Sequence, residues 1–502
     1  MNLKTLWLAG LLLLASTGLW AQQSPQAAQS LRIGSKRFTE SYILAQVLAQ
    51  TAAPHGPVEV KAGLGNTAIV YAALRAGSID LYPEYLGTID REILGNDGKP
   101  SSIENMREQL KPLGLGVDIA FGFNDGYALA VRADTAARLR LAKLSDLAAH
   151  PELRLGLSNE FIGRADGWAG LARRYGLAQK PTGLDHGLAY AAIADGQVDV
   201  IDIYTTDAKI AQLGLKVLAD TQAYFPRYDA VVLYRLDVPQ RFPAAWAAMQ
   251  RLAGRIDEPA MIAMNARAEL QGTSFDLIAR DHLAGAAAAP GQAARGFWDK
   301  LVGPDLLRLT WQHLTLVFVS VGCAVLIGVP LAVLVAPFGG PRAFVLGASG
   351  LLQTIPSIAL LAALISLTNQ IGAVPALVAL TLYSLLPIMR NCCTGLAEVP
   401  AGLKLAGTAL GFTRLQRLWL IELPLALPTL VAGICTATSI AVGTATIAAF
   451  IGAGGFGERI VTGLALNDKQ LLLAGALPSA ALALAFEGLF GLLAIAMNRR
   501  RP

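Results

Sequence analysis

Hydrophobic residues are unevenly distributed along the chain, and their pattern divides it into two halves. Between about residues 22 and 282, short runs of β-branched residues alternate with stretches of helical periodicity, which predicts a soluble α/β domain. From residue 305 to residue 502 the chain consists mainly of long apolar stretches with few charges, which predicts a membrane domain of helices. Residues 283–304 begin with the low-complexity run Leu283–Ala294, and we expect them to link the two domains.

The membrane half contains about five apolar segments that are long enough to cross a bilayer. They are Trp311–Val335, Phe344–Leu367, Val374–Cys393, Pro428–Ile451 and Leu471–Met497. If the soluble domain lies outside, the inside loops carry eight positive residues, namely Arg342, Arg390, Lys404, Arg414, Arg417, Arg499, Arg500 and Arg501. The outside loops then carry only Arg459 and Lys469, so the positive-inside rule supports this orientation. Hydropathy leaves a sixth span open, although it would move the soluble domain to the other side.

The N-terminus has the features of a secretory signal. Lys4 precedes the apolar run Leu6–Leu14, and the small residues that follow predict cleavage after Ala21, which makes residues 1–21 a signal peptide. Leu19 occupies the position where a small residue is favoured, so an uncleaved anchor stays open. In both cases we expect the soluble half to be exported.

The charge of the chain follows the same division. Residues 22–300 carry 29 Lys and Arg against 30 Asp and Glu, whereas residues 301–502 carry 11 against 6. The basic pI of about 9.0 therefore comes from the membrane half, and the soluble half has no positive excess with which to bind nucleic acid. We expect no nucleic-acid partner.

The sequence contains no recognisable set of catalytic or metal-binding residues. All four cysteines (Cys323, Cys392, Cys393 and Cys435) lie in the membrane half without metal-ligand spacing, so neither a disulfide framework nor a metal site is expected. Gly98-Lys99 is followed by Pro100 and forms no phosphate-binding loop, and the glycine run 452–457 follows a membrane span rather than a strand. We expect no enzyme and no bound cofactor.

One internal repeat singles out two tyrosines. Residues 72–81 and 191–200 both read as a helix end, a glycine and then a strand that begins after an aspartate. Tyr85 and Tyr204 each follow that aspartate by five residues, so two similar lobes would place them beyond equivalent strands, where open α/β sheets bind ligands. The alternative is a common helix-glycine-strand pattern without shared ancestry.

The loop from Glu398 to Pro424 resembles the coupling loop by which ABC-importer permeases contact their ATPase. It contains a small-residue helix, then Gly411, then Ile421-Glu422-Leu423-Pro424 at the family's spacing. The resemblance implies an ATPase contact formed by Glu398, Ala406, Ala409, Leu410, Gly411 and Pro424, with ATP used by that separate subunit. Leu405-Ala406-Gly407 replaces the usual Glu-Ala-Ala, which puts the family's acidic contact in doubt. An ordinary interfacial helix is the alternative.

The soluble half resembles the osmoprotectant-binding proteins of the glycine betaine, choline and carnitine uptake family. The matching segments lie in order along the domain and are 34–40 (GSKRFTE), 82–88 (YPEYLGT), 158–161 (SNEF), 166–171, 204–207 (YTTD) and 225–229 (FPRYD). This resemblance implies a type II two-lobed α/β periplasmic binding protein fold, followed by an all-α polytopic ABC-importer transmembrane domain.

Proteins of that family hold a quaternary ammonium among tyrosine rings, because a methylated ammonium cannot donate hydrogen bonds and aromatic faces attract it instead. By motif match, the resemblance implies a cage of Tyr85, Tyr127, Tyr204 and Tyr228, with Thr88 nearby. Arg164 and Lys36 are candidates for a ligand carboxylate. The alternatives are half-buried packing tyrosines and, for Arg164, an ordinary ion pair.

The whole sequence therefore predicts the binding and membrane subunit of an ABC importer in a bacterial inner membrane, with the N-terminal domain in the periplasm. We expect an ATPase subunit, a second permease half as a homodimer or a related subunit, and a small quaternary-ammonium ligand. A related family branch imports ergothioneine, which stays open as the ligand. A ligand-gated channel or a sensor are the other classes, but the first needs a pore loop and the second a cytoplasmic output domain.

Overall fold

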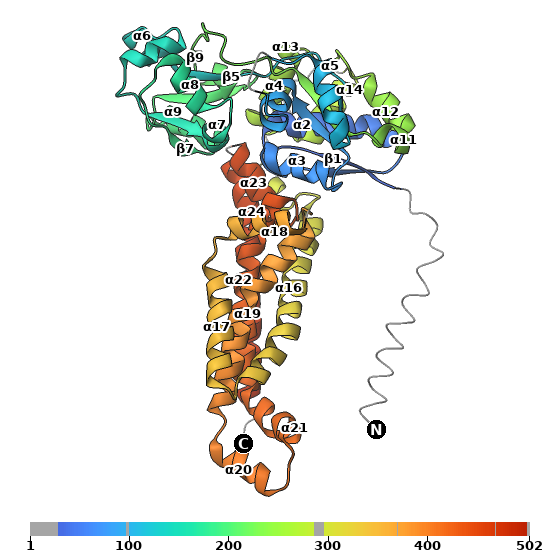
Figure 1. The fold of residues 1–502 in the computed structure, drawn as a ribbon, viewed down its shortest axis with the longest axis vertical. Coiled ribbons are helices and arrows are strands. Elements are labelled where there is room, and N and C mark those ends of the chain that lie inside the picture. Colours follow the sequence, from blue (N-terminus) through green and yellow to red (C-terminus); the bar gives the residue numbers. More distant parts are fainter. Residues whose placement is uncertain (1–28, 97–99, 286–295, 369, 467, 499–502) are drawn as a thin grey trace.

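The computed structural model places a two-lobed domain on one end of a long helical bundle (Figure 1). It describes residues 29–96, 100–285, 296–368, 370–466 and 468–498. The expected signal peptide, residues 286–295 of the linker and Arg499–Arg501 lie outside these residues. The type II two-lobed α/β fold followed by an all-α membrane domain, as predicted, is confirmed.

Lobe 1 is built on a five-stranded sheet of order β2-β1-β3-β10-β4, in which β10 runs antiparallel to its neighbours. The strands are β1 (Leu31–Gly34), β2 (Val58–Lys61), β3 (Leu81–Tyr85), β4 (Leu115–Asp118) and β10 (Ala230–Arg235). The helices are α2 (Thr39–Ala52), η1 (Ala53–His55), α3 (Thr67–Arg75), α4 (Leu86–Thr88), η2 (Ile89–Ile93), α5 (Ile103–Leu110), η3 (Lys111–Leu113), α11 (Val238–Arg241), α12 (Pro243–Gln250), α13 (Glu258–Glu269) and α14 (Phe275–Leu283).

Lobe 2 repeats this topology in its sheet β7-β6-β8-β5-β9, where β5 is the antiparallel strand. The strands are β5 (Tyr127–Arg132), β6 (Leu155–Ser158), β7 (Thr182–Leu184), β8 (Val200–Tyr204) and β9 (Leu215–Val217). The helices are α6 (Ala133–Leu139), η4 (Leu144–Ala149), α7 (Asn159–Gly163), α8 (Trp168–Tyr175), α9 (His186–Ala194) and α10 (Lys209–Gln212).

The internal repeat seen in the sequence is confirmed by this topology, because β3 and β8 occupy the same central place in their sheets. Both turns before these strands contain a glycine with positive φ, +70° at Gly77 and +67° at Gly196, which a side chain would strain. An aspartate precedes each of these strands and binds an arginine in or just before the neighbouring parallel strand. Asp80 before β3 binds Arg32 of β1, and Asp199 before β8 binds Arg154, which precedes β6.

The two lobes are connected by residues 119–126 and 218–229, which run side by side at the back of the cleft. Asn124 and Asp229 form an isolated antiparallel bridge, and the Asp125 amide donates to the Tyr228 carbonyl at 3.0 Å. One continuous hydrophobic cluster includes side chains of both lobes, among them Ile33 and Trp168. The lobes are therefore closed on each other.

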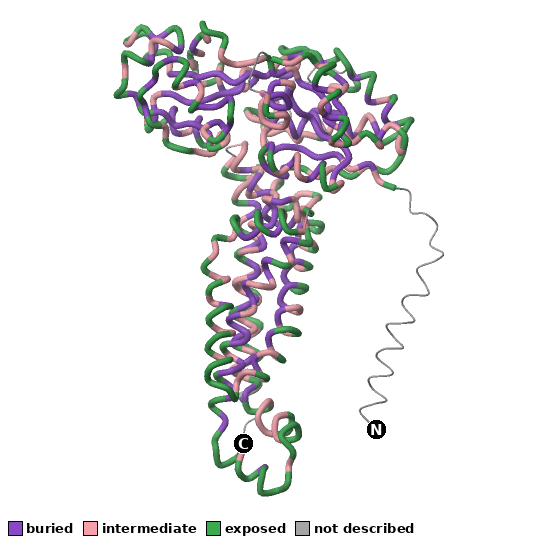
Figure 2. Tube along the Cα trace, in the orientation of Figure 1, coloured by how far each residue is buried: buried purple, intermediate pink, exposed green. Residues whose placement is uncertain are grey.

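The membrane domain is a bundle of apolar helices below the lobes (Figure 1). They are α16 (Leu306–Val335), α17 (Gly339–Thr354), α18 (Ser357–Thr368), α19 (Ala373–Glu398), α22 (Leu423–Ala445) and α24 (Lys469–Asn498). Shorter helices lie between them, namely α20 (Ala401–Ala409), α21 (Arg414–Arg417), η5 (Leu418–Glu422), η6 (Ile447–Ile451) and α23 (Gly457–Ala465), with α15 (Phe297–Leu301) before the bundle. Purple buried positions line the inside of the bundle and green exposed positions its outside (Figure 2). This distribution suits helices whose outer faces meet lipid or another subunit.

The second expected span differs from the prediction. Among the residues that the structure describes, four continuous helical stretches are long and apolar enough to cross a membrane, and there is a fifth only if α17 and α18, bent by 101°, together form one span. The break falls at Ile355, which has an extended conformation (φ −68°, ψ 126°). Pro356 explains it, because a proline disfavours the helical conformation in the residue before it.

The repeat offers a test of how burial changes the strength of an ion pair. Asp80 has a fully buried side chain and binds both Arg32 and Arg241. Burial raises the pKa of Asp80, but hydrogen bonds from Arg32 outweigh this and lower it below 3.8. We expect Asp80→Asn to destabilise the domain by about 2 kcal/mol, since half-buried Arg32 loses its carboxylate partner and Arg241 keeps only Asp237.

Asp199→Asn is the matched control, because Asp199 and Arg154 have side chains exposed by 17% and 55%. We expect this change to cost about 1 kcal/mol or less. Thermal unfolding of the detergent-solubilised chain measures both. Equal shifts in the unfolding temperature would contradict the assignment of the Asp80 pair as the stabilising one.

Candidate functional site

All seven ligand-binding residues expected from the sequence line one cavity between the lobes. The lining consists of Lys36, Phe38, Tyr85, Thr88, Asp125, Tyr127, Glu160, Arg164, Tyr204 and Tyr228. Most of these residues directly follow the carboxyl ends of parallel strands or lie in the connections between the lobes, which is where this sheet topology places ligands. The expectation that these seven residues lie together therefore agrees with the structure, whereas their binding role stays a prediction.

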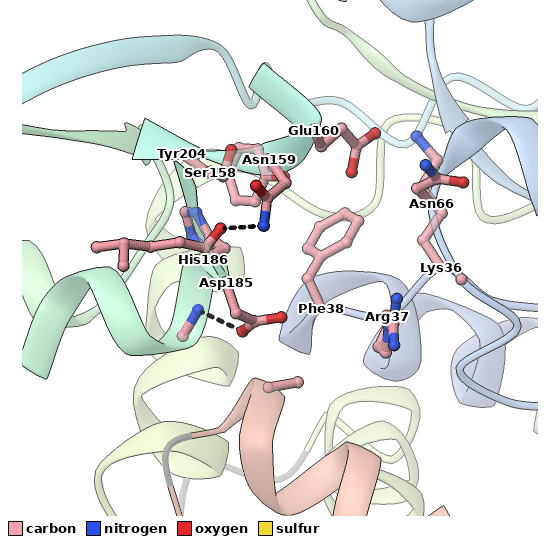
Figure 3. Close-up of a pocket in the computed structure, with 14 residues that line it drawn as sticks. Lys36, Arg37, Phe38, Asn66, Ser158, Asn159, Glu160, Asp185, His186 and Tyr204 are labelled. Carbon is pink, nitrogen blue, oxygen red and sulfur yellow. Dashed lines mark hydrogen bonds between the residues drawn. The ribbon is translucent and has the colours of Figure 1, made fainter. Parts of the chain in front are cut away.

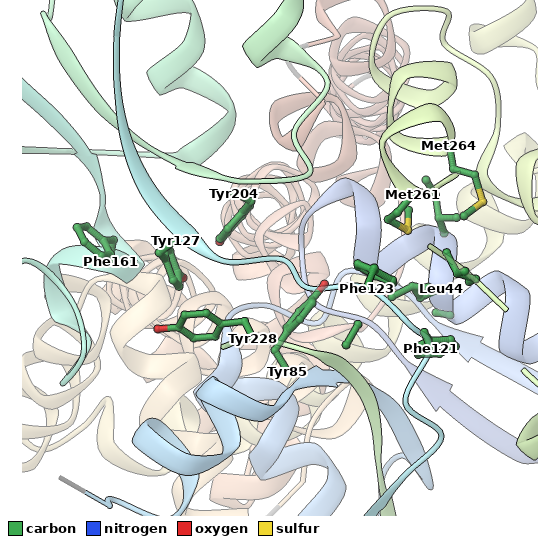
Figure 4. Close-up of a cluster of buried hydrophobic side chains, with 14 of the residues drawn as sticks. Leu44, Tyr85, Phe121, Phe123, Tyr127, Phe161, Tyr204, Tyr228, Met261 and Met264 are labelled. Carbon is green, nitrogen blue, oxygen red and sulfur yellow. The ribbon is translucent and has the colours of Figure 1, made fainter. Parts of the chain in front are cut away.

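Tyr85, Tyr127, Tyr204 and Tyr228, hereafter the cage tyrosines, converge from different parts of the fold (Figure 4). Tyr127 and Tyr204 face each other across the β5–β8 pair, with ring centroids 5.1 Å apart. Tyr228 meets the Tyr127 ring edge-on at 5.7 Å. Phe38 connects the two lobes, since its ring lies 5.1 Å from Tyr204 and 6.1 Å from Tyr85. Rings from both lobes and from the hinge thus surround one space.

Burial raises the pKa of each cage tyrosine well above the ordinary value of 10.0. The four phenols therefore remain neutral at any physiological pH. Their rings offer π faces without anionic charge, so a cation can be attracted to them only through the ring quadrupole or through nearby carboxylates.

The two candidate cations for a ligand carboxylate already have carboxylate partners. Lys36 forms a buried ion pair with Glu84, and Arg164 forms a two-bonded pair with Asp166 at 2.7 Å. Each cation also lies over a ring, Lys36 at 5.3 Å from the Tyr85 centroid and Arg164 at 5.0 Å from that of Tyr127. The ion-pair alternative for Arg164 is thus realised in this closed state.

Arg164 also connects the lobes. One of its nitrogens, Nη2, donates to the Thr88 hydroxyl in lobe 1 at 3.4 Å, while the other, Nη1, lies 3.9 Å from the Glu160 carboxylate. The contact between Nη1 and Glu160 is the longest polar contact of this guanidinium, so Nη1 can still donate to a ligand carboxylate. Thr88 therefore acts on the arginine rather than on the rings.

Three lining residues were missed as site residues by the sequence analysis, namely Phe38, Asp125 and Glu160. Phe38 and Glu160 lie inside the quoted motifs 34–40 and 158–161, so the signal was present there. Burial raises the pKa of Asp125 well above 3.8, which favours its neutral form. Lys36 and Arg164 line the cavity together with Glu160, and Glu84 and Asp166 pair with the two cations from behind the lining, so the lining and these partners together hold three carboxylates against two cations. This balance favours a cationic or zwitterionic ligand over an anion.

A buried hydrogen-bond network next to the cage holds the lobes together. The Glu40 carboxylate in lobe 1 accepts hydrogen bonds from the Tyr85 hydroxyl (2.5 Å), the Thr206 hydroxyl in lobe 2 (2.7 Å) and the Asn265 amide (3.4 Å). Burial raises the pKa of Glu40 to about 7, in spite of these hydrogen bonds. Glu40 thus connects the position of a cage tyrosine to the closure of the lobes.

A second cavity, hereafter the vestibule, adjoins the cage and is lined by Lys36, Arg37, Phe38, Gly65, Asn66, Ser158, Asn159, Glu160, Leu184, Asp185, His186, Gly187, Tyr204 and Ala465. Figure 3 shows the Phe38 ring in its middle, with Asp185 and His186 on the lobe 2 side and Lys36 and Arg37 on the lobe 1 side. Phe38 and Tyr204 belong to both cavities and separate them. Because Ala465 belongs to α23, the vestibule connects the cage with the membrane domain.

His186 lies on the vestibule side of the cage and packs against Tyr204 there. Its ring lies 4.3 Å from that of Tyr204, and its Nε2 is 3.0 Å from an Asp207 carboxylate oxygen. Burial lowers the pKa of His186, but the Asp207 charge outweighs this and raises it to about 9. The same Asp207 oxygen accepts from the Tyr204 amide, so this ion pair fixes Tyr204 from behind.

At the opposite end of the bundle, the expected ATPase-coupling loop forms a helical hairpin (Figure 1). Ala406, Ala409 and Leu410 are exposed on or just after α20, and Leu410 is 76% exposed. Gly411 has φ +80°, which allows the turn towards α21. Glu398 ends α19, and Pro424 is exposed in the first turn of α22. Exposed apolar residues at a loop tip are typical of a protein contact.

The unusual Leu405-Ala406-Gly407 sequence has a structural explanation. Gly407 is buried, and a Cβ atom there would come within 2.7 Å of the Ile421 side chain. The missing side chain lets α20 pack on η5, and Arg417 donates to the Thr408 hydroxyl of α20 at 3.1 Å across the hairpin. The departure from Glu-Ala-Ala is therefore matched by close packing within the loop.

Comparison with known families identifies both parts of the chain. Residues 29–285, half of the chain, match the family described as the substrate binding domain of ABC-type glycine betaine transport systems. Residues 324–499 match the family described as the inner membrane component of binding-protein-dependent transport systems. The chain belongs to the ABC-type glycine betaine transport family.

Three relatives illustrate the membership. The osmoprotectant import permease protein OsmW of Salmonella typhimurium is 45% identical over 38% of this chain and 92% of its own length. The choline transport system permease protein OpuBB of Bacillus subtilis is 40% identical over 40% of this chain and 90% of its own length. The ergothioneine transport permease/ergothioneine binding protein EgtU of Helicobacter pylori is 29% identical over 54% of this chain and 51% of its own length.

The two matches together settle the general class. The chain is a binding protein fused to an ABC-importer permease and a membrane protein, so it is a transport subunit rather than an enzyme. A permease of this family implies a small ligand and an ATPase partner. The channel and sensor alternatives drawn from the sequence are not supported by these families.

The Glu40 network generates a prediction about pH. When the lobes part and water reaches Glu40, its pKa returns towards the ordinary 4.5, so closing takes up a proton between pH 4.5 and about 7. We expect the closed fraction of the ligand-free chain to fall as the pH rises through this window, by up to tenfold per pH unit. Glu40→Gln removes most of this dependence.

Energy transfer between dyes on the exposed positions Glu108→Cys and Arg138→Cys, in a chain without its native cysteines, measures the closed fraction. Glu269→Gln is the comparison, because burial raises the pKa of Glu269 to about 7 as well, on a different helix. A Glu40→Gln chain that keeps the full pH dependence would refute the role of Glu40.

Proposed function

We propose that this chain binds a quaternary ammonium compound such as glycine betaine, choline or carnitine in the closed tyrosine cage and passes it through its membrane domain into the cell. The observation that supports this most strongly is the convergence of four neutral tyrosine rings on one space between the lobes, together with Phe38. The carboxylates in and behind its lining outnumber the cations by one, which favours a positive head group.

The physics of the ligand explains this composition. A methylated ammonium carries its charge under methyl groups and offers no donor, so carboxylates alone cannot hold it with hydrogen bonds. A ring face contributes about 2 kcal/mol per desolvated contact, without demanding a fixed direction. Since Lys36 and Arg164 lie over rings of the cage already and are held there by Glu84 and Asp166, a ligand takes the remaining ring faces.

Arg164 and Lys36 remain the proposed groups for a ligand carboxylate, which glycine betaine and carnitine have and choline lacks. The Nη1 atom of Arg164 supports this role, because its one charged neighbour, Glu160, is 3.9 Å away. Lys36 is a point charge held by Glu84, and its remaining N–H donors lack the planar two-bonded geometry with which a guanidinium binds a carboxylate. We infer that Arg164 is the more important of the two.

Ergothioneine is the second candidate. Its betaine group fits the same cage, and the relative EgtU combines a permease and a binding protein in one chain, as this chain does. The larger imidazole part of ergothioneine needs additional space beside the rings. The adjoining vestibule, reached past Phe38, provides it.

We further propose that the chain works in a bacterial inner membrane, with the lobes in the periplasm and the α20–α21 hairpin in the cytoplasm. A second permease half completes the pathway, as a homodimer or with a related subunit. The ATPase docks on Ala406, Ala409 and Leu410, with Glu398, Gly411 and Pro424 shaping the loop, and supplies all the ATP chemistry. The chain itself carries no cofactor in this proposal.

Uptake of radiolabelled choline and glycine betaine tests the proposal, in cells that lack other importers and express this chain with its ATPase. We expect Tyr127→Ala to reduce apparent affinity about 30-fold, the equivalent of 2 kcal/mol for one ring. Tyr127→Phe is the matched control and keeps the affinity within about threefold, because it retains the ring. Absence of uptake of either compound by the wild-type chain, with ergothioneine also negative, would overturn the proposal.

The coupling loop is tested by Leu410→Ser, with Leu270→Ser as control. Both leucines are exposed, by 76% and 41%, but Leu270 lies on the surface of lobe 1. We expect Leu410→Ser to reduce ligand-stimulated ATP hydrolysis at least tenfold without changing choline affinity, since the contact lies at the far end of the bundle. Similar activities of the two variants would exclude Leu410 from the ATPase contact.

A further inference from the structure

One short stretch of the membrane domain, residues 447–466, contacts both lobes, and we refer to it as the docking segment. It consists of η6, a glycine-rich turn and α23. Its first part lies against lobe 1. The Arg37 guanidinium lies 4.6 Å from the centroid of the Phe450 ring, and Gly452 packs so closely on Leu64 that a Cβ atom would be 2.3 Å from its side chain.

The last part of the docking segment lies against lobe 2. A Cβ atom at Gly187 would meet the carbonyl oxygens of Leu464 and Ala465 at 2.6 and 2.7 Å, so only glycine allows this approach. Lys209 donates to the Leu466 carbonyl at 3.4 Å. These contacts place the end of α23 directly beneath α9 (Figure 1).

Two of the docking contacts, those at Arg37 and Gly187, lie one residue away from a wall of the cage. Arg37 precedes Phe38, whose ring touches both Tyr85 and Tyr204. Gly187 follows His186, which stacks on Tyr204 from the vestibule side. The vestibule lies between these two contacts, and Ala465 closes it on the membrane side. The docking segment therefore touches each lobe next to a residue that forms a wall of the cage.

The docking segment is held in a fixed position relative to the bundle. Ala448 and Ile451 are buried in the core formed by the membrane helices. Arg459 on α23, only 4% exposed, forms a two-bonded pair with Asp305 at 2.7 and 3.0 Å and donates to the carbonyls of Leu301 and Ala474. These bonds tie α23 to the beginning of α16 and to α24.

A fixed segment can contact both lobes only when their separation matches it, and in this structure that separation is the closed one. We propose that the docking segment is the element with which the permease distinguishes the closed, loaded binding domain from the open one, through Arg37 and Leu64 on lobe 1 and Gly187 and Lys209 on lobe 2. The Arg459 pair transmits the contact to α16 and α24. This inference rests on the proposed import function, and it adds the residues that connect binding to transport.

Gly187→Ala tests the inference, because the three atoms closest to the added Cβ all belong to the docking segment. Gly163→Ala is the matched control, since a Cβ at that lobe 2 glycine meets no atom within 4 Å. We expect Gly187→Ala to reduce the rate of choline or glycine betaine uptake at least tenfold. Equilibrium binding of the same compounds to the solubilised full chain should change less than threefold in both variants.

Equal uptake by the Gly187→Ala and Gly163→Ala chains would overturn the inference, as would a loss of binding that accompanies the loss of uptake. A ligand-independent measurement separates this result from a failure of the proposed function. In a chain without native cysteines, Lys209→Cys and Leu466→Cys should be joined by a short thiol-specific cross-linker at least tenfold faster than Arg138→Cys and Leu466→Cys, since Lys209 contacts the Leu466 carbonyl and α6 lies at the far end of lobe 2 (Figure 1). If the wild-type chain binds none of the quaternary ammonium compounds, the ratio of the two cross-linking rates still tests whether lobe 2 contacts the docking segment. A ratio near one would contradict that contact.

Discussion

The organisation of this protein depends on one constraint, which is that its aromatic cage is divided between two lobes. Tyr85 and Phe38 come from lobe 1, Tyr127 and Tyr204 from lobe 2, and Tyr228 from the connection between them. Because a cation gains from each ring only when the rings surround it, the binding proposed for this cage is coupled to closure of the lobes. The hinge, the Glu40 network and the contacts with the membrane domain all depend on how far the lobes are closed.

Charge inside the closed cleft is handled by local pairing. Lys36 with Glu84, Arg164 with Asp166 and His186 with Asp207 each keep a buried cation next to a carboxylate, so none of them has to be neutralised by the ligand. Each of these cations also lies beside a cage ring. The protein thus places positive charge beside the rings, from Lys36 and Arg164 in the cavity lining and from His186 on the vestibule side, and each charge has its own carboxylate.

Much of this arrangement could be predicted from the sequence. The repeat around Gly77 and Gly196 located Tyr85 and Tyr204 beyond equivalent strands, because a glycine turn and a following buried strand leave a clear pattern. Hydropathy predicted the membrane helices but not the break at Pro356, since averaged apolarity does not register a bend between two helices of similar composition. Pairing partners escaped prediction for a different reason. Asp166 is two residues from Arg164, but Glu84 is 48 residues from Lys36, and only the folded sheet brings the latter two together.

Affinity as a function of methylation tests the central claim most directly. Calorimetric titration of the solubilised full chain with glycine betaine, dimethylglycine, sarcosine and glycine changes only the number of methyl groups on the ammonium. A cage of neutral rings predicts that glycine betaine binds and that affinity falls several-fold or more with each lost methyl group, because every new N–H needs an acceptor that a ring face supplies poorly. Equal affinity for glycine and glycine betaine, or binding that Tyr85→Ala/Tyr204→Ala leaves intact, would contradict it.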